Sequence, residues 1–368
     1  MATPQLSPGV LTREVDLTVG RAENVLDNIG AIAGPFAIGP VDEATDISTE
    51  QDLINVFGEP KNNDAQYEYW MAASSYLSYG GVLKVVRTAG TTLANANAGT
   101  DEAAATMTGA GRIDNYDDYI QNHAEATDFT FAAKNPGSWA NNLKVCVIDD
   151  AADQTLTLAS IGAATVGMAV TSVLEAVEVP GVGSTSSFTG YLKSIITSVN
   201  TTTKVVDVKI VSRVATDGTE TAIDYAEGTA YASFQAADQV YVINNSGVKV
   251  GSVAAANTVV DWYDQQTLGL TNSTVYWKSI AGKPKTNKYS LDRAGKNDGI
   301  HVVVVDDLGD VTGIQGQILE KHTNLSKAGD AVSDVNSPQK IWYEQFLADY
   351  SDNIYAGSNP GGANDTYW

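Results

Sequence analysis

The sequence predicts a multi-domain α+β protein, in which a mainly β peripheral domain is inserted into a mixed α/β core. Residues 23–91 and 283–356 combine apolar strand patterns with helix signals. Residues 151–282 are instead rich in Thr, Val, Ser and Gly, with strand patterns and few helix signals. The chain has 368 residues, which exceeds one typical domain of about 100 to 200 residues. A β-rich domain inserted between the two parts of one α/β core explains why the α/β patterns stop at residue 151 and resume after residue 282.

Residues 1–22 are expected to form an extended amino-terminal arm. Pro4 and Pro8 disfavour a helix, and the segment after Gly9 alternates only partly, as a strand on a sheet edge does. An arm this short has no core of its own, so it needs a partner to pair with. The candidate residues for a strand between subunits are Val10, Leu11, Thr12, Arg13, Glu14 and Val15.

The first part of the core, residues 23–91, predicts strand, helices and strand in that order. An apolar strand spans residues 29–34, and Ser48 or Thr49 can cap a helix with Gln51 or Asp52 three residues later. Gly58 ends this helix. A second helix fits residues 64–79, and residues 82–87 form a buried strand. This order favours a mixed sheet covered by helices.

The rest of the chain divides into four parts. Residues 92–150 predict a loop-rich segment that returns to core strands at 129–131 and 143–148. Within residues 151–282, the expected strands are a hairpin of 191–199 with 204–211, a pair at 240–243 and 248–250, and a strand at 274–277. Residues 283–356 predict a second core part, with a strand at 301–305 and a helix at 314–325. Residues 357–368 have the composition of a linker.

The charge balance argues against a nucleic-acid partner. The chain has 44 acidic and 22 basic residues, and phosphate neutralisation needs clustered Lys and Arg. One basic cluster stands out as a candidate contact for an acidic partner, although a solvated loop between two domains is the more common origin of such a run. Its members are Lys283, Lys285, Lys288, Arg293 and Lys296. No signal peptide and no membrane-spanning run of apolar residues is expected from the sequence.

The sequence predicts no catalytic, cofactor or metal site. His123, His301 and His322 have no ligand spacing with Cys or carboxylates, and no phosphate-binding or dinucleotide-binding motif is present. Cys146 lies in an apolar strand pattern and indicates a core residue. Adjacent aspartates occur at 117–118, 149–150 and 306–307, where turn formation is favoured over acid–base catalysis or calcium binding.

Four stretches, which together extend over most of the chain, share one resemblance. The first is Leu6–Val10 with the Thr-rich, acidic arm that follows. The second is Gly58–Pro60 followed by Tyr69–Val86. The third is Ala133–Val145, and the fourth is Ile300–Asp306 with Leu319–Lys321 and Leu325–Ala328. Any one stretch alone is weak, but the combination specifically resembles the tail sheath proteins of contractile, T-even-like bacteriophages.

The resemblance implies a structural protein and not an enzyme. It implies hexameric rings that stack around a tail tube and contract to drive the tube through the host envelope. The partners it implies are further copies of the chain, the tail tube protein, and the baseplate and tail terminator proteins. The implied location is the virion tail, assembled in the host bacterial cytoplasm.

Members of this family extend well beyond 368 residues, so the chain is expected to be an amino-terminal portion, with residues 357–368 leading to a further carboxyl-terminal part. A baseplate or tail-fibre adhesin is the alternative, because it would also be acidic and β-rich. A carbohydrate-active enzyme that uses a carboxylate pair is the weaker alternative.

Overall fold

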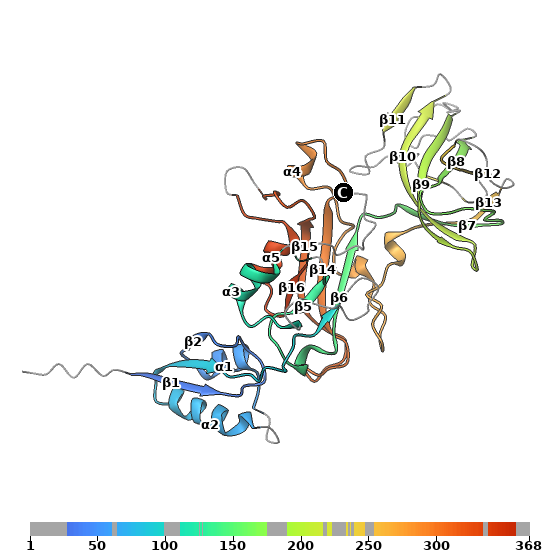
Figure 1. Ribbon diagram of the computed structural model, residues 1–368. Helices are drawn as coiled ribbons and strands as arrows, with labels where there is room; N and C mark the ends of the chain where they lie inside the picture. Colours follow the sequence, from blue (N-terminus) through green and yellow to red (C-terminus); the bar gives the residue numbers. More distant parts are fainter. Residues whose placement is uncertain are drawn as a thin grey trace, which may run out of the picture. The chain divides into compact units, whose positions relative to one another are not determined.

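The computed structural model describes residues 28–60, 65–98, 111–124, 126, 128–174, 190–215, 219–222, 233–234, 236, 239–246, 254–333 and 338–357. These residues form two compact units (Figure 1). The first contains residues 28–36 and 43–88, and the second contains residues 37–42 and the described residues from 89 onward. The arm, with Val10, Leu11, Thr12, Arg13, Glu14 and Val15, and the linker from residue 358 onward lie outside the described residues.

The first unit is a three-stranded mixed sheet with two helices. Strands β1 (Ile29–Gly34) and β3 (Val82–Arg87) are parallel, and β2 (Ala44–Ile47) is antiparallel to β3. Helices α1 (Glu50–Phe57) and α2 (Gln66–Leu77) lie between β2 and β3 in the chain. The expected strands and helices are therefore present, and β2 is an addition that the sequence did not predict.

Side chains from both helices and the sheet form one core in this unit. The buried members are Phe36, Ile47, Leu53, Phe57, Trp70, Ala73, Leu77, Leu83 and Val85. Helix α1 begins with the expected capping box, because the hydroxyl of Thr49 accepts from the amide of Asp52 and the Asp52 carboxylate accepts from the amide of Thr49. Gly58, at φ 81°, ends the helix in a conformation that favours glycine.

The centre of the second unit is a three-stranded antiparallel sheet in the order β15-β14-β6. It consists of β6 (Leu143–Asp149), β14 (Gly299–Asp306) and β15 (Gln317–Ser326). Every residue of β14 is buried, because alternate side chains enter two different cores. Val303 and Val305 pack with Trp262, Tyr263, Leu268 and Trp277, whereas Ile300, Val302 and Val304 pack with Phe131, Tyr343, Leu347 and Ile354.

The helix expected at residues 314–325 is wrong, because most of this segment is strand β15. Its composition includes helix formers, but Gly309, Gly313 and Gly316 adopt positive φ angles and turn the chain back along β14. The segment then forms backbone hydrogen bonds with β14, which stabilise it as a strand and not as a helix. The strand expected at 274–277 is also absent. Tyr276 makes one bridge to Thr267, and a 3₁₀ turn follows at Trp277–Ser279.

A second, smaller sheet and several helices complete this part of the unit. Strands β4 (Asn97–Ala98), β5 (Phe131–Ala133) and β16 (Ile354–Ala356) form the order β16-β5-β4. The helices are α3 (Tyr116–Asp118), which continues as a π-helical turn at Tyr119–His123, α4 (Lys288–Leu291) and α5 (Tyr343–Tyr350). Short 3₁₀ turns occur at Ser138–Ala140 and Tyr263–Gln265.

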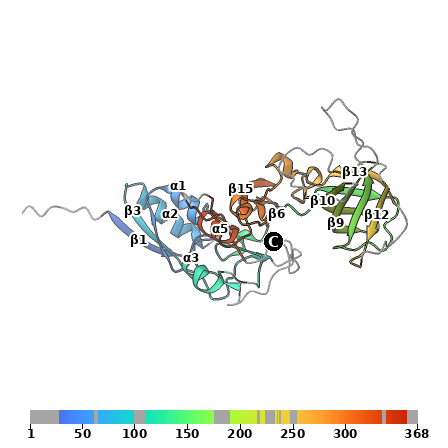
Figure 2. The ribbon, with the colours of Figure 1, turned by 90° about the horizontal axis from the view of Figure 1, so that it is seen from above.

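Residues 154–261 contain an antiparallel sheet that closes on itself. Its strands are β7 (Gln154–Leu158), β8 (Ala169–Leu174), β9 (Gly190–Asn200), β10 (Val205–Ala215), β11 (Glu220–Ala222), β12 (Gln239–Ile243) and β13 (Ala254–Asp261). The order is β11-β10-β7-β13-β12-β8-β9, and β9 also pairs with β10, which closes a barrel (Figure 2).

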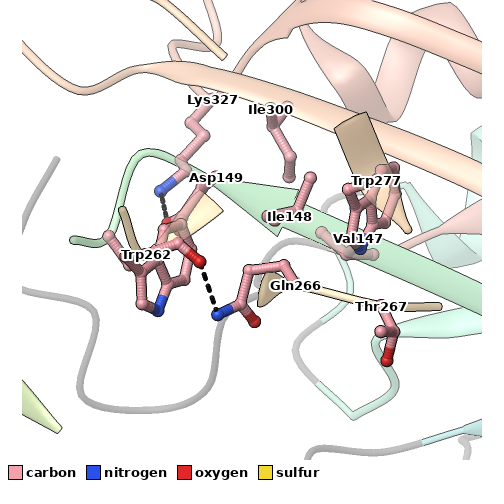
Figure 3. Close-up of a pocket in the computed structure, with 10 residues that line it drawn as sticks. Val147, Ile148, Asp149, Trp262, Gln266, Thr267, Trp277, Ile300 and Lys327 are labelled. Atoms are coloured by element: carbon pink, nitrogen blue, oxygen red, sulfur yellow. Dashed lines mark hydrogen bonds and ion pairs between the residues drawn. The ribbon is translucent and has the colours of Figure 1, made fainter. Parts of the chain in front are cut away.

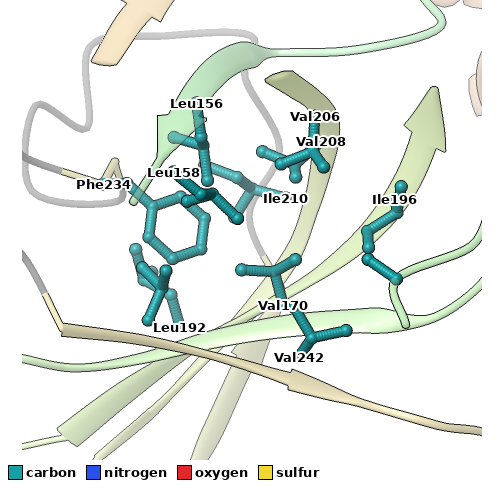
Figure 4. Packing of buried hydrophobic residues seen from close by; sticks show 12 residues of the cluster. Leu156, Leu158, Val170, Leu192, Ile196, Val206, Val208, Ile210, Phe234 and Val242 are labelled. Carbon is teal, nitrogen blue, oxygen red and sulfur yellow. The ribbon is translucent and has the colours of Figure 1, made fainter. Parts of the chain in front are cut away.

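The β9–β10 hairpin confirms the predicted pairing of residues 191–199 with 204–211. The pairing expected between 240–243 and 248–250 falls partly outside the described residues, because residues 247–253 are among those not described. The interior of the barrel is apolar, with Leu156, Leu192, Val206 and Phe234 among its buried side chains (Figure 4). A closed sheet with such a core is consistent with a mixed, multi-domain protein that contains helices and several sheets.

Candidate interaction surface

The predicted basic cluster lies in one folded segment, residues 283–296, which leads into β14. We call it the basic segment. The amide of Asn287 donates to Asp298 at 2.8 Å, and the amide of Asn297 donates to Thr286 at 3.0 Å. A Cβ atom added at Gly299 would lie only 2.1 Å from the carbonyl oxygen of Lys285, so the segment packs closely against the start of β14.

The structure gives the five basic residues different surroundings. Lys283 makes ion pairs of 2.7 Å with both Asp150 and Asp153. Burial acts to lower the pKa of Lys283, but the two carboxylates outweigh it and raise the pKa above its ordinary value. The guanidinium of Arg293 stacks on the ring of Tyr289, 3.6 Å from its centroid.

The side chains of Lys285, Lys288, Arg293 and Lys296 are exposed. Four of the five positive charges thus lie at the surface, while Lys283 contributes to an internal network. Leu291, at the end of α4, is also exposed, with 47% of its surface accessible. The basic segment therefore combines positive charge with one apolar side chain.

A pocket of about 300 Å³ lies at the end of β6 where Asp149 is located (Figure 3). It is lined by Val147, Ile148, Asp149, Ala151, Trp262, Gln266, Thr267, Trp277, Ile300 and Lys327. Asp149 and Lys327 form an ion pair of 2.5 Å, and the side chain of Gln266 donates to the carbonyl of Trp262 at 3.2 Å. No pattern in the sequence predicts that the segment containing Trp262 and Trp277 lies against β6.

His301 and Asp306 both hydrogen-bond to backbone groups of the chain. His301 is fully buried; its Nε2 lies 2.8 Å from the carbonyl of Gly282 and its Nδ1 accepts from the amide of Asn324. Asp306 accepts from three backbone amides, those of Gly309, Val311 and Thr312. Within the part of the chain that the structure describes, no group of three or more His, Cys, Asp or Glu side chains is arranged to hold a metal ion.

No helix in the described ranges is both long enough and apolar enough to cross a bilayer.

Comparison with known proteins gives two matches of similar strength. The chain is 37% identical over 84 residues to the tail sheath protein of Vibrio phage KVP40, and 37% identical over 82 residues to the tail sheath protein of Enterobacteria phage T4. Each alignment covers 22% of this chain and 12% of the relative, so the chain matches only a small part of the length of either protein. No family model matches. These two matches support a relationship of this chain to bacteriophage tail sheath proteins.

Proposed function

We propose that the chain is a structural protomer of a contractile bacteriophage tail sheath and that it has no enzymatic role. The observation that carries the proposal is the 37% identity to two tail sheath proteins. In this proposal, copies assemble as stacked hexameric rings around the tail tube. Contraction performs work because the extended lattice is a trapped state of higher free energy, so no nucleotide site is needed.

The proposed setting is the virion tail, assembled in the host bacterial cytoplasm. The proposed partners are further copies of the chain, the tail tube protein, and the baseplate and tail terminator proteins. The excess of acidic over basic residues favours protein partners over nucleic acid, and no insertion into a membrane is proposed.

The amino-terminal arm is proposed to connect subunits. Residues 10–15 would add a strand to a sheet of a neighbouring subunit, where main-chain hydrogen bonds give affinity without a large rigid interface. Such a tether would allow subunits to rotate against one another and remain attached. Pro4, Pro8 and Gly9 support this role because they prevent a competing helix.

Electron microscopy of the purified chain, alone and co-expressed with a tail tube protein, tests the proposal. We expect rings or tubes with the wild-type chain. Leu11→Pro removes a backbone donor and should abolish tubes without changing the thermal unfolding of the folded units, whereas the control Leu11→Val should leave tubes intact. Isolated particles that never form rings or tubes would contradict the sheath function, and normal tubes from Leu11→Pro would contradict the role of the arm.

A further inference from the structure

The loop that follows β14 is held in a fixed conformation by two buried carboxylates. Asp306 is fully buried, and it accepts from the amides of Gly309 at 3.0 Å, Val311 at 3.0 Å and Thr312 at 2.7 Å, and from the Thr312 hydroxyl at 2.9 Å. Asp307 accepts from the amide and hydroxyl of Thr271 at 3.0 and 2.6 Å. The loop is therefore ordered before any partner binds, which lowers the entropy cost of binding.

This loop, residues 307–316, exposes three apolar side chains. The exposed fractions are 39% for Leu308, 37% for Val311 and 61% for Ile314. We call these residues the apolar loop. The loop contains no basic residue, and its exposed charge is that of Asp310, because Asp306 and Asp307 are buried and hydrogen-bonded within the chain. Three exposed apolar side chains on one preorganised loop offer an apolar surface for a protein partner.

The apolar loop and the basic segment lie at opposite ends of β14. Strand β14 starts at Gly299, directly after the basic segment, and its Ile300 pairs with Asp149. The strand ends at Asp306, which pairs with Leu143, and the apolar loop follows. A strand of this length separates the two ends by about 25 Å, at roughly 3.3 Å per residue. One copy of the chain therefore cannot bring these surfaces into contact with each other.

The exposed charges of the two surfaces are opposite in sign: Asp310 lies on the apolar loop, and Lys285, Lys288, Arg293 and Lys296 lie on the basic segment. The basic segment contains five basic residues and one acidic residue, Asp292, in a chain whose net charge is −22. Copies of such an acidic chain repel one another except where a basic surface meets an acidic one. The exposed side chain of Leu291, among the exposed lysines, offers an apolar contact for the apolar loop.

We propose that the apolar loop of one copy binds the basic segment of a second copy, in a head-to-tail contact along the direction of β14. Leu308, Val311 and Ile314 contact Leu291, and Asp310 lies among the charges of Lys285, Lys288, Arg293 and Lys296. This contact uses two different surfaces, so it is heterologous and adds copies in rings or helices. The proposal rests on the sheath function, because that function supplies the second copy as the partner.

Two single substitutions and their mixture test the contact in the full chain. Ile314→Asp disables the apolar loop, and Leu291→Asp disables the basic segment. Val166→Asp is the matched control, because Val166 is 54% exposed but lies in the loop between β7 and β8. All variants should keep the wild-type circular dichroism and unfolding temperature. Sedimentation velocity then measures self-association, and electron microscopy records rings or tubes.

We expect each of the two substitutions to weaken self-association by roughly tenfold or more, and Val166→Asp to leave it unchanged. In an equimolar mixture of Ile314→Asp and Leu291→Asp, the intact loop of one copy should bind the intact basic segment of the other. This restores one-to-one pairs, which the same contact cannot extend further. Variants that assemble as well as wild-type protein would overturn the contact and leave the sheath function standing. Mixed dimers without any rings or tubes from wild-type protein would support the contact and count against the sheath function.

Discussion

The ammonium group of Lys283 lies 2.7 Å from a carboxylate oxygen of Asp153, and this ion pair joins the segment that enters the β-barrel to the segment that follows it. Asp153 also pairs with Lys209 of strand β10 at 3.1 Å, and its second oxygen accepts from the amide of Ile210 at 2.8 Å. The side chain of Asp153 is fully buried, so its charge depends entirely on these partners.

Asp153→Asn should therefore destabilise the protein. The substitution removes the charge of a buried carboxylate, while Asp150 still pairs with Lys283 at 2.7 Å and with Lys209 at 2.6 Å. We therefore expect the free energy of unfolding to fall by roughly 1 to 3 kcal/mol in urea titrations. The control Lys84→Met breaks the pair between Lys84 and Asp46, whose side chains are 47% and 61% exposed. Lys84→Met should lower the free energy of unfolding by less than about 1 kcal/mol. Equal effects of the two substitutions would mean that the Asp153 network does not stabilise the fold.

Glu320 should make stability depend on acid pH. Burial acts to raise its pKa, but hydrogen bonds from His322, Ser351 and Asn353 outweigh this and hold the pKa below its ordinary value. The stabilisation is therefore complete above the unfolded-state pKa of about 4.3, and it is lost as the pH falls through the lower folded-state pKa. Glu320→Gln should lower the free energy of unfolding by roughly 1 to 3 kcal/mol at neutral pH.

The difference between wild-type protein and Glu320→Gln should shrink below about pH 4, because the wild-type carboxyl then loses its charge as well. Urea unfolding of both proteins over a series of pH values measures it. A difference that stays constant into acid would show that the charge of Glu320 does not contribute.

The capping box of α1 offers a local test. Thr49→Ala should lower the free energy of unfolding by about 1 kcal/mol, since it removes the side-chain acceptor for the amide of Asp52. Asp52→Ala should cost a similar amount, because it removes the acceptor for the amide of Thr49. The double variant should lose less than the sum if the two hydrogen bonds support each other, and a double-mutant cycle of chemical unfolding measures this coupling. Strict additivity would contradict a cooperative capping box.

The sequence predicted those features that depend on residues close together in the chain. The capping box and the β9–β10 hairpin depend on neighbouring residues, so their patterns were sufficient. Strand β15 contains helix formers, and it is extended because it pairs with β14, the strand that precedes it across the loop at 307–316. Similarly, the basic cluster was visible as a run of charges, but the ion pairs of Lys283 with Asp150 and Asp153 join residues about 130 positions apart.

We expect the core to require residues 262–282 in addition to the central sheet. The sequence places an inserted domain at 151–282, but Trp262, Leu268 and Trp277 pack with Cys146 and Val303 beside the central sheet. The barrel strands themselves run from Gln154 to Asp261, and the amide of Trp262 donates to the carbonyl of Asp153 at 3.1 Å. The two ends of the barrel segment are thus adjacent, and a short Gly-Ser linker can replace residues 154–261.

We expect the replacement of residues 154–261 to leave a folded core with the α-helical circular dichroism of the parent. It removes the ion pair of Lys209 with Asp153. Replacing residues 151–282 instead removes the aromatic side chains that cover one face of β14, exposing Val303 and Val305. Uncovering such side chains costs about 1.5 to 3 kcal/mol for each. The longer replacement should therefore unfold at a lower temperature or aggregate, and differential scanning calorimetry of the two proteins makes the comparison. If both replacements unfold at the same temperature, residues 262–282 do not contribute to the core.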